Sequence, residues 1–168
     1  MKSIASLVDN TNLSQNVYYM TRTFNKMKDI SPLCYYIDLS TQALKCNFSV
    51  LNCYYANHYS GGPIIATSLE TLNVLINLNI RAPKFFYCWD LEWLRNSKFS
   101  YSDNMGSFTN EYISIIARSE SHAKCIENYS NKKVSHIIEN WEYDKIRGLC
   151  DGNLFGVDQG LCGRAVID

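Results

Sequence analysis

One pattern recurs along this chain and constrains its fold more than any other: a short apolar run, a capping residue, and then apolar residues at helical spacing. Residues 64–76 show it most clearly, because the run IIA precedes Thr67 and a leucine stripe follows. With Glu70 three positions after Thr67, this segment predicts a capping box and then an amphipathic helix. The same switch recurs in segments 3–27, 85–96, 112–128 and 134–146, with Ser14 or Asn12, Asp90, Ser119 and Asn140 as predicted caps.

Five such switches in series predict an α/β fold, in which a single doubly wound, Rossmann-like and mostly parallel sheet carries helices on both faces. Apolar runs at 32–39 and 48–55 predict two further strands. The polar segment 98–111 is predicted to be a loop that covers a binding crevice as a lid. Because five of the eight glycines fall in the last part of the chain, we predict one domain over residues 1–147 and a glycine-rich tail over 148–168.

Charge and composition exclude several classes of protein. The chain has 168 residues, 46% hydrophobic and 19% charged, which suits one globular domain with its own core. Lys plus Arg number 16, as do Asp plus Glu, so no overall field draws the chain to nucleic acid or to an anionic membrane. No apolar run is long enough to cross a bilayer, and the cysteines include no close pair of the zinc-ribbon type. We therefore expect a cytoplasmic protein with reduced thiols, no metal and no membrane contact.

The expected fold also predicts where a ligand binds. In an open doubly wound sheet, ligands occupy the crevice beyond the carboxyl ends of the strands. The capping segments expected along that edge are residues 9–14, 67–68, 89–92, 118–122 and 139–141. The chain has no G-x-G-x-x-G, Walker, G-x-S-x-G or H-E-x-x-H motif, so the chemistry must come from individual side chains at this edge.

Asp90 and His122 are the candidates for a catalytic role. His122 is predicted one turn into a helix, three residues after Ser119, where it could act as a general base or bind a hydroxyl or a phosphate. In the alternative it packs against the sheet with Ile126 and Tyr129. Asp90 either caps the following helix, which contributes about 1 kcal/mol, or orients a substrate hydroxyl and acts as a base. The two roles of Asp90 are compatible.

Further residues on the same edge are predicted substrate contacts: Asp9, Asn12, Trp89, Glu92, Arg118 and Ser119. Trp89 and Trp93 are four residues apart, so we expect them on one side of a helical turn, where they either stack on a sugar or base or fill the core. Glu92 is expected to be exposed. Arg118 either meets a phosphate or carboxylate or pairs with a nearby glutamate at the surface.

Two blocks of the sequence resemble a known family: "KFFYCWDLEWL" and "ISIIARSESHAKCIENYSNKKVSHIIENW". They are similar to the N-terminal halves of small phage-encoded glycosyltransferases of the two-domain GT-B type, and the resemblance runs from about Ile4 to Ile146. In that type the N-terminal domain mainly binds the acceptor, and the C-terminal domain makes most contacts to the nucleotide-sugar donor. The resemblance implies that an acceptor faces Asp9, Asn12, Trp89, Asp90, Arg118 and His122.

The resemblance implies a glycosyltransferase-like function with no intrinsic cofactor, a nucleotide-sugar as donor and, in one interpretation, a modified base of phage DNA as acceptor. The sequence departs from the family after Ile146, where a glycine-rich tail stands in place of a second doubly wound domain. The chain is then expected either to act with a partner in the host cytoplasm or to be inactive, and the expected partner is a donor domain or a second copy of the chain. The alternative is a non-catalytic phage module for interaction or self-assembly, and a third, weaker hypothesis is a small enzyme that holds a nucleotide cofactor within this one domain.

Overall fold

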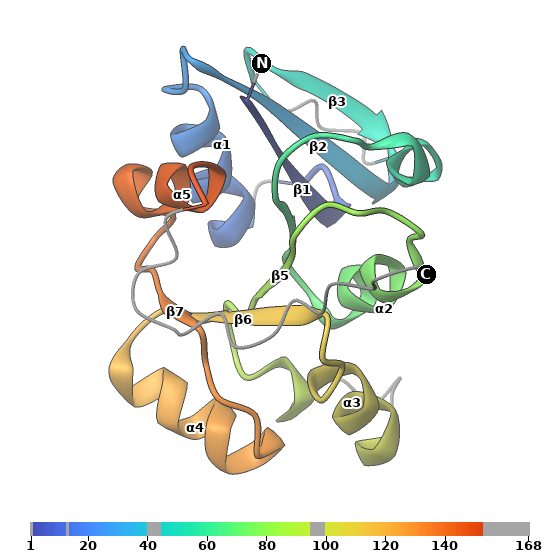
Figure 1. Ribbon diagram of the computed structural model, residues 1–168, viewed down its shortest axis with the longest axis vertical. Coiled ribbons are helices and arrows are strands. Elements are labelled where there is room, and N and C mark those ends of the chain that lie inside the picture. Colours follow the sequence, from blue (N-terminus) through green and yellow to red (C-terminus); the bar gives the residue numbers. More distant parts are fainter. Residues whose placement is uncertain (1, 13, 40–44, 95–99, 153–168) are drawn as a thin grey trace, which may run out of the picture.

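The computed structural model describes residues 2–12, 14–39, 45–94 and 100–152, and these residues form an α/β fold on one seven-stranded sheet (Figure 1). The strands are β1 (Lys2–Asn10), β2 (Ile30–Asp38), β3 (Ser49–Asn52), β4 (Ile64–Ala66), β5 (Lys84–Tyr87), β6 (Ile113–Ala117) and β7 (His136–Ile137). Every neighbouring pair of strands is parallel. The predicted doubly wound, Rossmann-like fold is confirmed.

The strand order β3-β2-β1-β4-β5-β6-β7 creates a topological switch point beside β1. From β1 the chain adds β2 and β3 on one side, and it then returns to the other side of β1 to add β4 to β7. Leu7 of β1 accordingly lies beside Tyr35 of β2 and Ala66 of β4. The connections diverge between β1 and β4, which is the position where doubly wound sheets bind ligands.

Helices cover both faces of the sheet, because strand residues alternate between two hydrophobic cores. The helices are α1 (Gln15–Phe24), α2 (Leu69–Asn77), α3 (Tyr101–Phe108), α4 (Glu120–Ser130) and α5 (Tyr143–Cys150). Ile4 and Val8 share one core with α1 and α5, whereas Ala5 and Leu7 share the other with α2, α3 and α4. Figure 1 shows α1 and α5 together on the left of the sheet and α2 on its right.

Two predicted caps are confirmed, and the predicted capping box is wrong. Ser14 and Ser119 each accept a hydrogen bond from the first turn of α1 and α4. The cap of α2 is Ser68, which forms a capping box with Thr71 in place of the predicted one. Thr67 lies between β4 and this cap, and its hydroxyl donates a hydrogen bond to the carbonyl oxygen of Leu7 at 2.8 Å.

The predicted polar lid over residues 98–111 is also wrong, because the segment contains helix α3. Ser100 caps α3 and forms a capping box with Asp103. Phe108, at the end of α3, is fully buried and contacts Phe86 edge-to-face at 5.6 Å. α3 therefore covers one face of the sheet, where burial of Phe108 outweighs the polarity of the rest of the segment.

Two elements around predicted strands differ from expectation. Asp90 caps no α-helix: its carboxylate accepts a hydrogen bond from the N–H of Leu91 at 2.8 Å, and a 3₁₀ helix, Glu92–Leu94, follows. The end of that predicted helix lies outside the described residues. β3 is shorter than the predicted strand 48–55, because the side chain of Asn52 caps a second 3₁₀ helix, Cys53–His58.

The turn between β7 and α5 corrects the predicted cap at Asn140. Asn140 and Trp141 both have positive φ, 47° and 58°, and α5 begins only after Glu142. A left-handed backbone is strained for a tryptophan. Two buried hydrogen bonds hold Trp141 in this conformation. Its indole N–H donates to Asn16 Oδ1 at 2.7 Å, and its carbonyl oxygen accepts from Thr23 Oγ1 at 2.6 Å.

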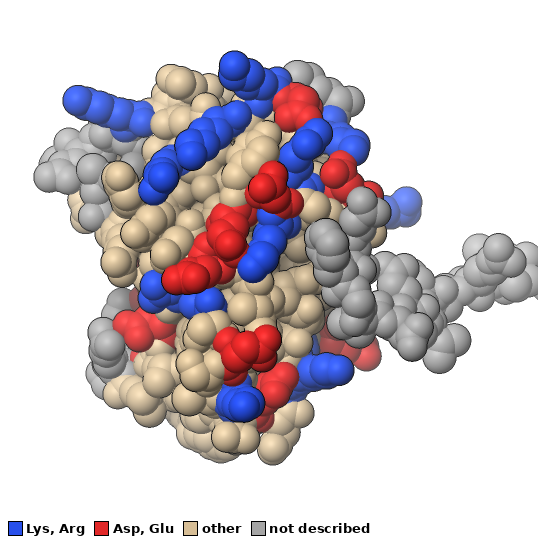
Figure 2. All heavy atoms as spheres, turned by 90° about the vertical axis from the view of Figure 1, so that its left-hand side faces the viewer, with Lys and Arg blue, Asp and Glu red and all other residues tan. Residues whose placement is uncertain are grey.

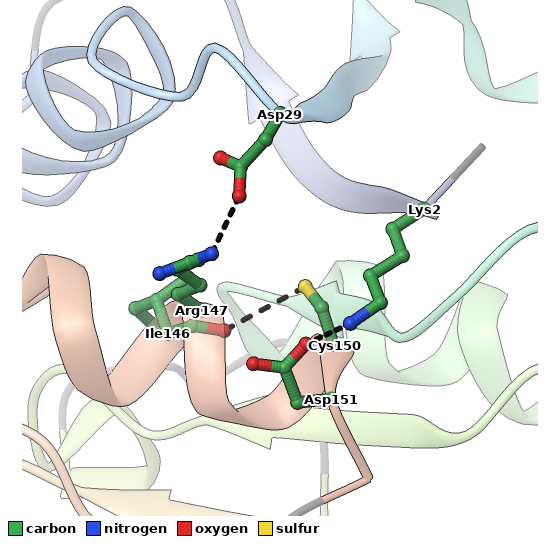
Figure 3. Close-up of polar contacts among 6 residues, drawn as sticks. All are labelled: Lys2, Asp29, Ile146, Arg147, Cys150 and Asp151. Carbon is green, nitrogen blue, oxygen red and sulfur yellow. Dashed lines mark hydrogen bonds and ion pairs between the residues drawn. The ribbon is translucent and has the colours of Figure 1, made fainter.

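α5 continues past the predicted domain boundary. Gly148 and Leu149 are buried within the helix, so the first residues of the predicted tail belong to the fold, while 153–168 lie outside the described residues. Figure 3 shows how the end of α5 is tied to the sheet. Arg147 pairs with Asp29 ahead of β2 at 2.6 Å, and Lys2 of β1 pairs with the C-cap residue Asp151.

The charged surface carries no large region of one sign on the face that Figure 2 shows. Lys and Arg side chains lie among Asp and Glu side chains across that face (Figure 2). None of the helices in the described part of the chain combines the length and the apolar character that a membrane span requires.

Candidate functional site

Three adjoining cavities open along the carboxyl edge of the sheet. The switch-point cavity, about 280 Å³, is lined by Val8, Asp9, Asn10, Ser14, Gln15, Asn16, Val17, Thr67, Ser68, Trp89, Asp90 and Glu92. The arginine cavity, about 300 Å³, is lined by Trp89, Asp90, Leu91, Arg118, Ser119, His122 and Glu139. The α1 cavity, about 440 Å³, is lined by Tyr19, Arg22, Thr23, Lys26, Glu139, Asn140, Trp141, Glu142 and Tyr143. A fourth cavity lies beside β7 over residues 134–138 and contains none of the predicted site residues.

Two carboxylates occupy the N-terminus of α2 in the switch-point cavity. Glu92 Oε2 accepts a hydrogen bond from the backbone N–H of Leu69 at 2.9 Å, and Asp9 accepts one from the hydroxyl of Ser68. The N–H of Thr71 already donates to Ser68 Oγ at 3.1 Å. The amides to which nucleotide folds bind a phosphate are therefore partly used by the protein's own side chains.

Glu92 is the residue whose environment differs most from the prediction. It was expected to be exposed, but the 3₁₀ helix turns its carboxyl group toward α2, where it is partly buried. Burial and the nearby carboxylates of Asp9 and Asp90 raise the pKa of Glu92 to about 7, against the opposing effect of the Leu69 hydrogen bond. A carboxyl group that titrates near neutral pH is suited to accept and return a proton.

Trp89 and Trp93 do not share one side of a helical turn. Trp89 packs in the core under α1 and α5, where its ring centre lies 5.8 Å from that of Tyr19 and 5.6 Å from that of Tyr87. Trp93 packs in the opposite core and stacks on Tyr129 at 4.5 Å. The separation arises because a strand end and a 3₁₀ turn join them where a helix was expected. Trp89 is 9% exposed, so it forms a wall between two cavities and offers little ring surface to a ligand.

Arg118 extends from the end of β6 across Trp89. Its guanidinium carbon lies 4.1 Å from the centre of the Trp89 ring, a cation–π contact. Nη2 donates to Asn140 Oδ1 at 3.2 Å, while Nε is buried without a hydrogen-bond partner. Among the described residues Arg118 forms no ion pair with Glu120 or Glu139, so the predicted surface pair is absent there.

His122 lies beside Arg118, in the arginine cavity, in the first turn of α4. Nδ1 accepts a long hydrogen bond, 3.4 Å, from the N–H of Arg118, and Nε2 is buried without a partner. Burial and the charge of Arg118 lower the pKa of His122, and Asp90 opposes them. The ring is therefore neutral at pH 7. Ser119 acts as the cap of α4, and its hydroxyl oxygen accepts a hydrogen bond from the N–H of His122 at 3.2 Å.

Asp90 lines the candidate site, whereas Asn12 does not. Asp90 lines both the switch-point and the arginine cavity, which makes it the residue that joins them. Asn12 lines none of the three cavities; it is exposed, and its N–H donates to Asn10 Oδ1 at 3.0 Å. The structure thus brings together Asp9, Trp89, Asp90, Glu92, Arg118, Ser119 and His122, but not Asn12.

Sequence reasoning missed two residues that support the site. Asn140 orients Arg118, and Asn16 spans α1 and the β4–α2 connection by donating to the carbonyl oxygen of Thr67 at 3.2 Å. Both are asparagines in polar segments, and only the strand order brings their partners near them. No local pattern in the sequence indicates either role.

Within the described residues, no group of three or more His, Cys, Asp or Glu side chains is arranged to hold a metal ion. No protein-family model, curated protein or solved structure matches this chain. What the site can do is therefore argued from its own geometry and charges.

Proposed function

We propose that this domain binds the acceptor of a sugar transfer, as the acceptor-side domain of a glycosyltransferase of the GT-B type, in which a nucleotide-sugar donor is held by a second domain or a partner chain. The observation that carries the proposal is the cluster of Asp9, Asp90 and Glu92 around the switch-point cavity. In a nucleotide-binding domain of this topology that position receives a phosphate.

The charges at the switch point favour a hydroxyl group over a phosphate. Three carboxylates would repel a phosphate, and the α2 amides of Leu69 and Thr71 already have acceptors. A hydroxyl group, in contrast, donates its proton to a carboxylate and accepts from a neighbouring N–H. A saccharide acceptor therefore fits this cavity better than a nucleotide does.

Glu92 is the best-placed proton acceptor. A sugar hydroxyl is a weak nucleophile until a base removes its proton, and a base works best when its pKa lies near the working pH. With a pKa of about 7, Glu92 meets that condition, and Asp90 orients the hydroxyl beside it. His122 and the cationic Arg118 line the adjoining arginine cavity, where their nitrogen atoms can bind a further hydroxyl group of the acceptor.

Calorimetric titration tests this proposal with neutral mono- and disaccharides, nucleosides and UDP-glucose as separate ligands. We expect a saccharide to bind and UDP-glucose not to bind to this domain alone. Asp9→Asn should weaken saccharide binding about tenfold, since it removes one charged hydrogen-bond acceptor. Glu111→Gln, an exposed carboxylate ahead of β6, is the matched control and should bind as the parent does. Saturable binding of UDP-glucose with no saccharide binding would overturn the proposal.

A second candidate function, a non-catalytic interaction module, is favoured by the edge of the sheet at β3. No described strand pairs with the outer edge of β3, and exposed apolar side chains lie on it and beyond it: Leu51 (38% exposed), Tyr54 (74%) and Tyr55 (54%). Such an edge can pair with another chain. Light scattering across a concentration series tests it: self-association that Tyr54→Ser and Tyr55→Ser together abolish would support this candidate.

A further inference from the structure

The three cavities adjoin one another, and together they are called the trough below. Trp89 and Asp90 line both the switch-point and the arginine cavity, and Glu139 lines both the arginine and the α1 cavity. Arg118, in the middle cavity, donates to Asn140 in the wall of the third. Neighbouring cavities thus share side chains in the walls between them. The volumes of the three cavities, about 280, 300 and 440 Å³, lie at or near the lower end of the range of about 300–1,000 Å³ that is typical of ligand pockets, so the three together suit a chain of several units.

The charges of the trough do not favour a polyanion as its occupant. The walls carry five carboxylates against three cationic side chains, Arg22, Lys26 and Arg118. Proteins that hold single-stranded nucleic acid follow its backbone with an excess of positive charge. Figure 2 likewise shows acidic side chains interspersed with basic ones on the face that it presents.

The lining of the far end fits a neutral chain that is rich in hydroxyl groups. Arg22 and Lys26 can donate hydrogen bonds to a ligand, and the rings of Tyr19 and Tyr143 offer partly buried aromatic surface. Sugar rings combine hydroxyl edges with apolar faces, and so match this mixture. An extended peptide would instead bind by adding a strand to the open edge of β3, which lies at one end of the sheet and outside the trough.

From this arrangement we infer that the acceptor is a neutral oligosaccharide, whose reacting unit occupies the switch-point cavity and whose further units run through the arginine cavity into the α1 cavity. The inference rests on the proposed function and adds the length of its substrate. Arg22 and Lys26 then determine specificity for longer chains, because they touch only units distant from the reacting hydroxyl.

The test is a size series bound to the full chain. The probes are α-linked and β-linked hexose oligomers of one, two, four and six units, with oligothymidylate as the polyanionic comparison. We expect affinity to rise by about tenfold or more from one unit to four in one series. Arg22→Ala should weaken four-unit binding about fivefold and leave one-unit binding unchanged, whereas Asp9→Asn should weaken both.

Lys28→Ala is the matched control, since Lys28 is an exposed cation just beyond α1 that lines none of the three cavities of the trough, and it should change neither affinity. One-unit ligands that bind as tightly as longer ones, or an Arg22→Ala effect that is equal at every length, would overturn the inference while leaving the proposed function intact. Preference for oligothymidylate would overturn it in favour of nucleic acid. If no saccharide of any length binds, the inference and the proposed function both fail.

Discussion

Arg118 lies over Trp89, with its guanidinium carbon 4.1 Å from the ring centre, and its Nη2 donates a hydrogen bond to Asn140. This contact links the end of β6 to the end of β5 and forms the wall between two cavities. A strained turn sets the position of Asn140, because both it and Trp141 have positive φ. The geometry of the candidate site thus depends on packing around Trp141, on the α1 and α5 side of the sheet.

Arg118→Lys should lower the free energy of unfolding by about 1 kcal/mol, because an ammonium group keeps the charge but loses the guanidinium contact with Trp89 and the hydrogen bond to Asn140. Urea unfolding followed by circular dichroism measures the difference. Arg81→Lys, an exposed arginine ahead of β5, is the control and should stay within about 0.5 kcal/mol of the parent. Equal effects of the two substitutions on the free energy of unfolding would show that the contact of Arg118 with Trp89 does not stabilise the fold.

Glu92→Gln should stabilise the protein increasingly as the pH rises from 4.5 to 7. The folded-state pKa of Glu92 is raised to about 7 from an ordinary value of 4.5, so between these values the folded state binds more protons than the unfolded state. Stability of the parent therefore falls across this window, by roughly 2–3 kcal/mol after allowance for partial exposure. Glutamine keeps an oxygen for the Leu69 N–H and does not ionise.

The measurement for Glu92 is urea unfolding of the parent and of Glu92→Gln at pH 5 and at pH 8. The free energy of unfolding of the variant should exceed that of the parent at pH 8 and differ little from it at pH 5. Glu111→Gln serves as the control, since that carboxylate is exposed and should give the same difference at both pH values. A Glu92→Gln effect that does not vary with pH would contradict the raised pKa.

Trp141→Phe should destabilise the fold by about 2 kcal/mol, because it leaves the buried Asn16 Oδ1 without its donor and removes part of a fully buried ring. Trp93→Phe is the comparison, since Trp93 is only partly buried and its indole donates no hydrogen bond within the described residues. This substitution should lower the free energy of unfolding by less than about 1 kcal/mol. Thermal unfolding by calorimetry distinguishes them, and a larger loss at Trp93 would contradict the role given to Trp141.

The residues that sequence reasoning identified correctly are those whose role depends on near neighbours. Ser14 and Ser119 cap helices that begin one residue later, and apolar runs buried on both faces predicted a parallel sheet. Because parallel strands bring all their carboxyl ends to one edge, Asp9, Asp90, Arg118 and His122 could also be assigned to that edge. α3 escaped prediction because only one of its three buried residues, Phe108, is apolar, whereas Asn104 and Ser107 are polar.

Glu92 shows why the rest could not be predicted. Its partner, the N–H of Leu69, is 23 residues away, and the two meet only because β4 and β5 are neighbours. Its raised pKa likewise depends on Asp9, which reaches the same cavity from β1. Trp89 and Trp93 illustrate a related limit, since a single turn that is 3₁₀ and not α sends the two rings to opposite faces of the sheet.

Ser68→Ala should lower the free energy of unfolding by about 1–2 kcal/mol, whereas Glu70→Gln should change it by less than about 0.5 kcal/mol. Ser68 caps α2 and donates to Asp9, so its loss leaves the N–H of Thr71 without that acceptor and the carboxylate of Asp9 without that donor. Glu70 lies in the first turn of α2, where its charge interacts favourably with the helix dipole. Urea unfolding at pH 8 measures both variants. A loss at Glu70 as large as that at Ser68 would restore the capping box that pairs Thr67 with Glu70.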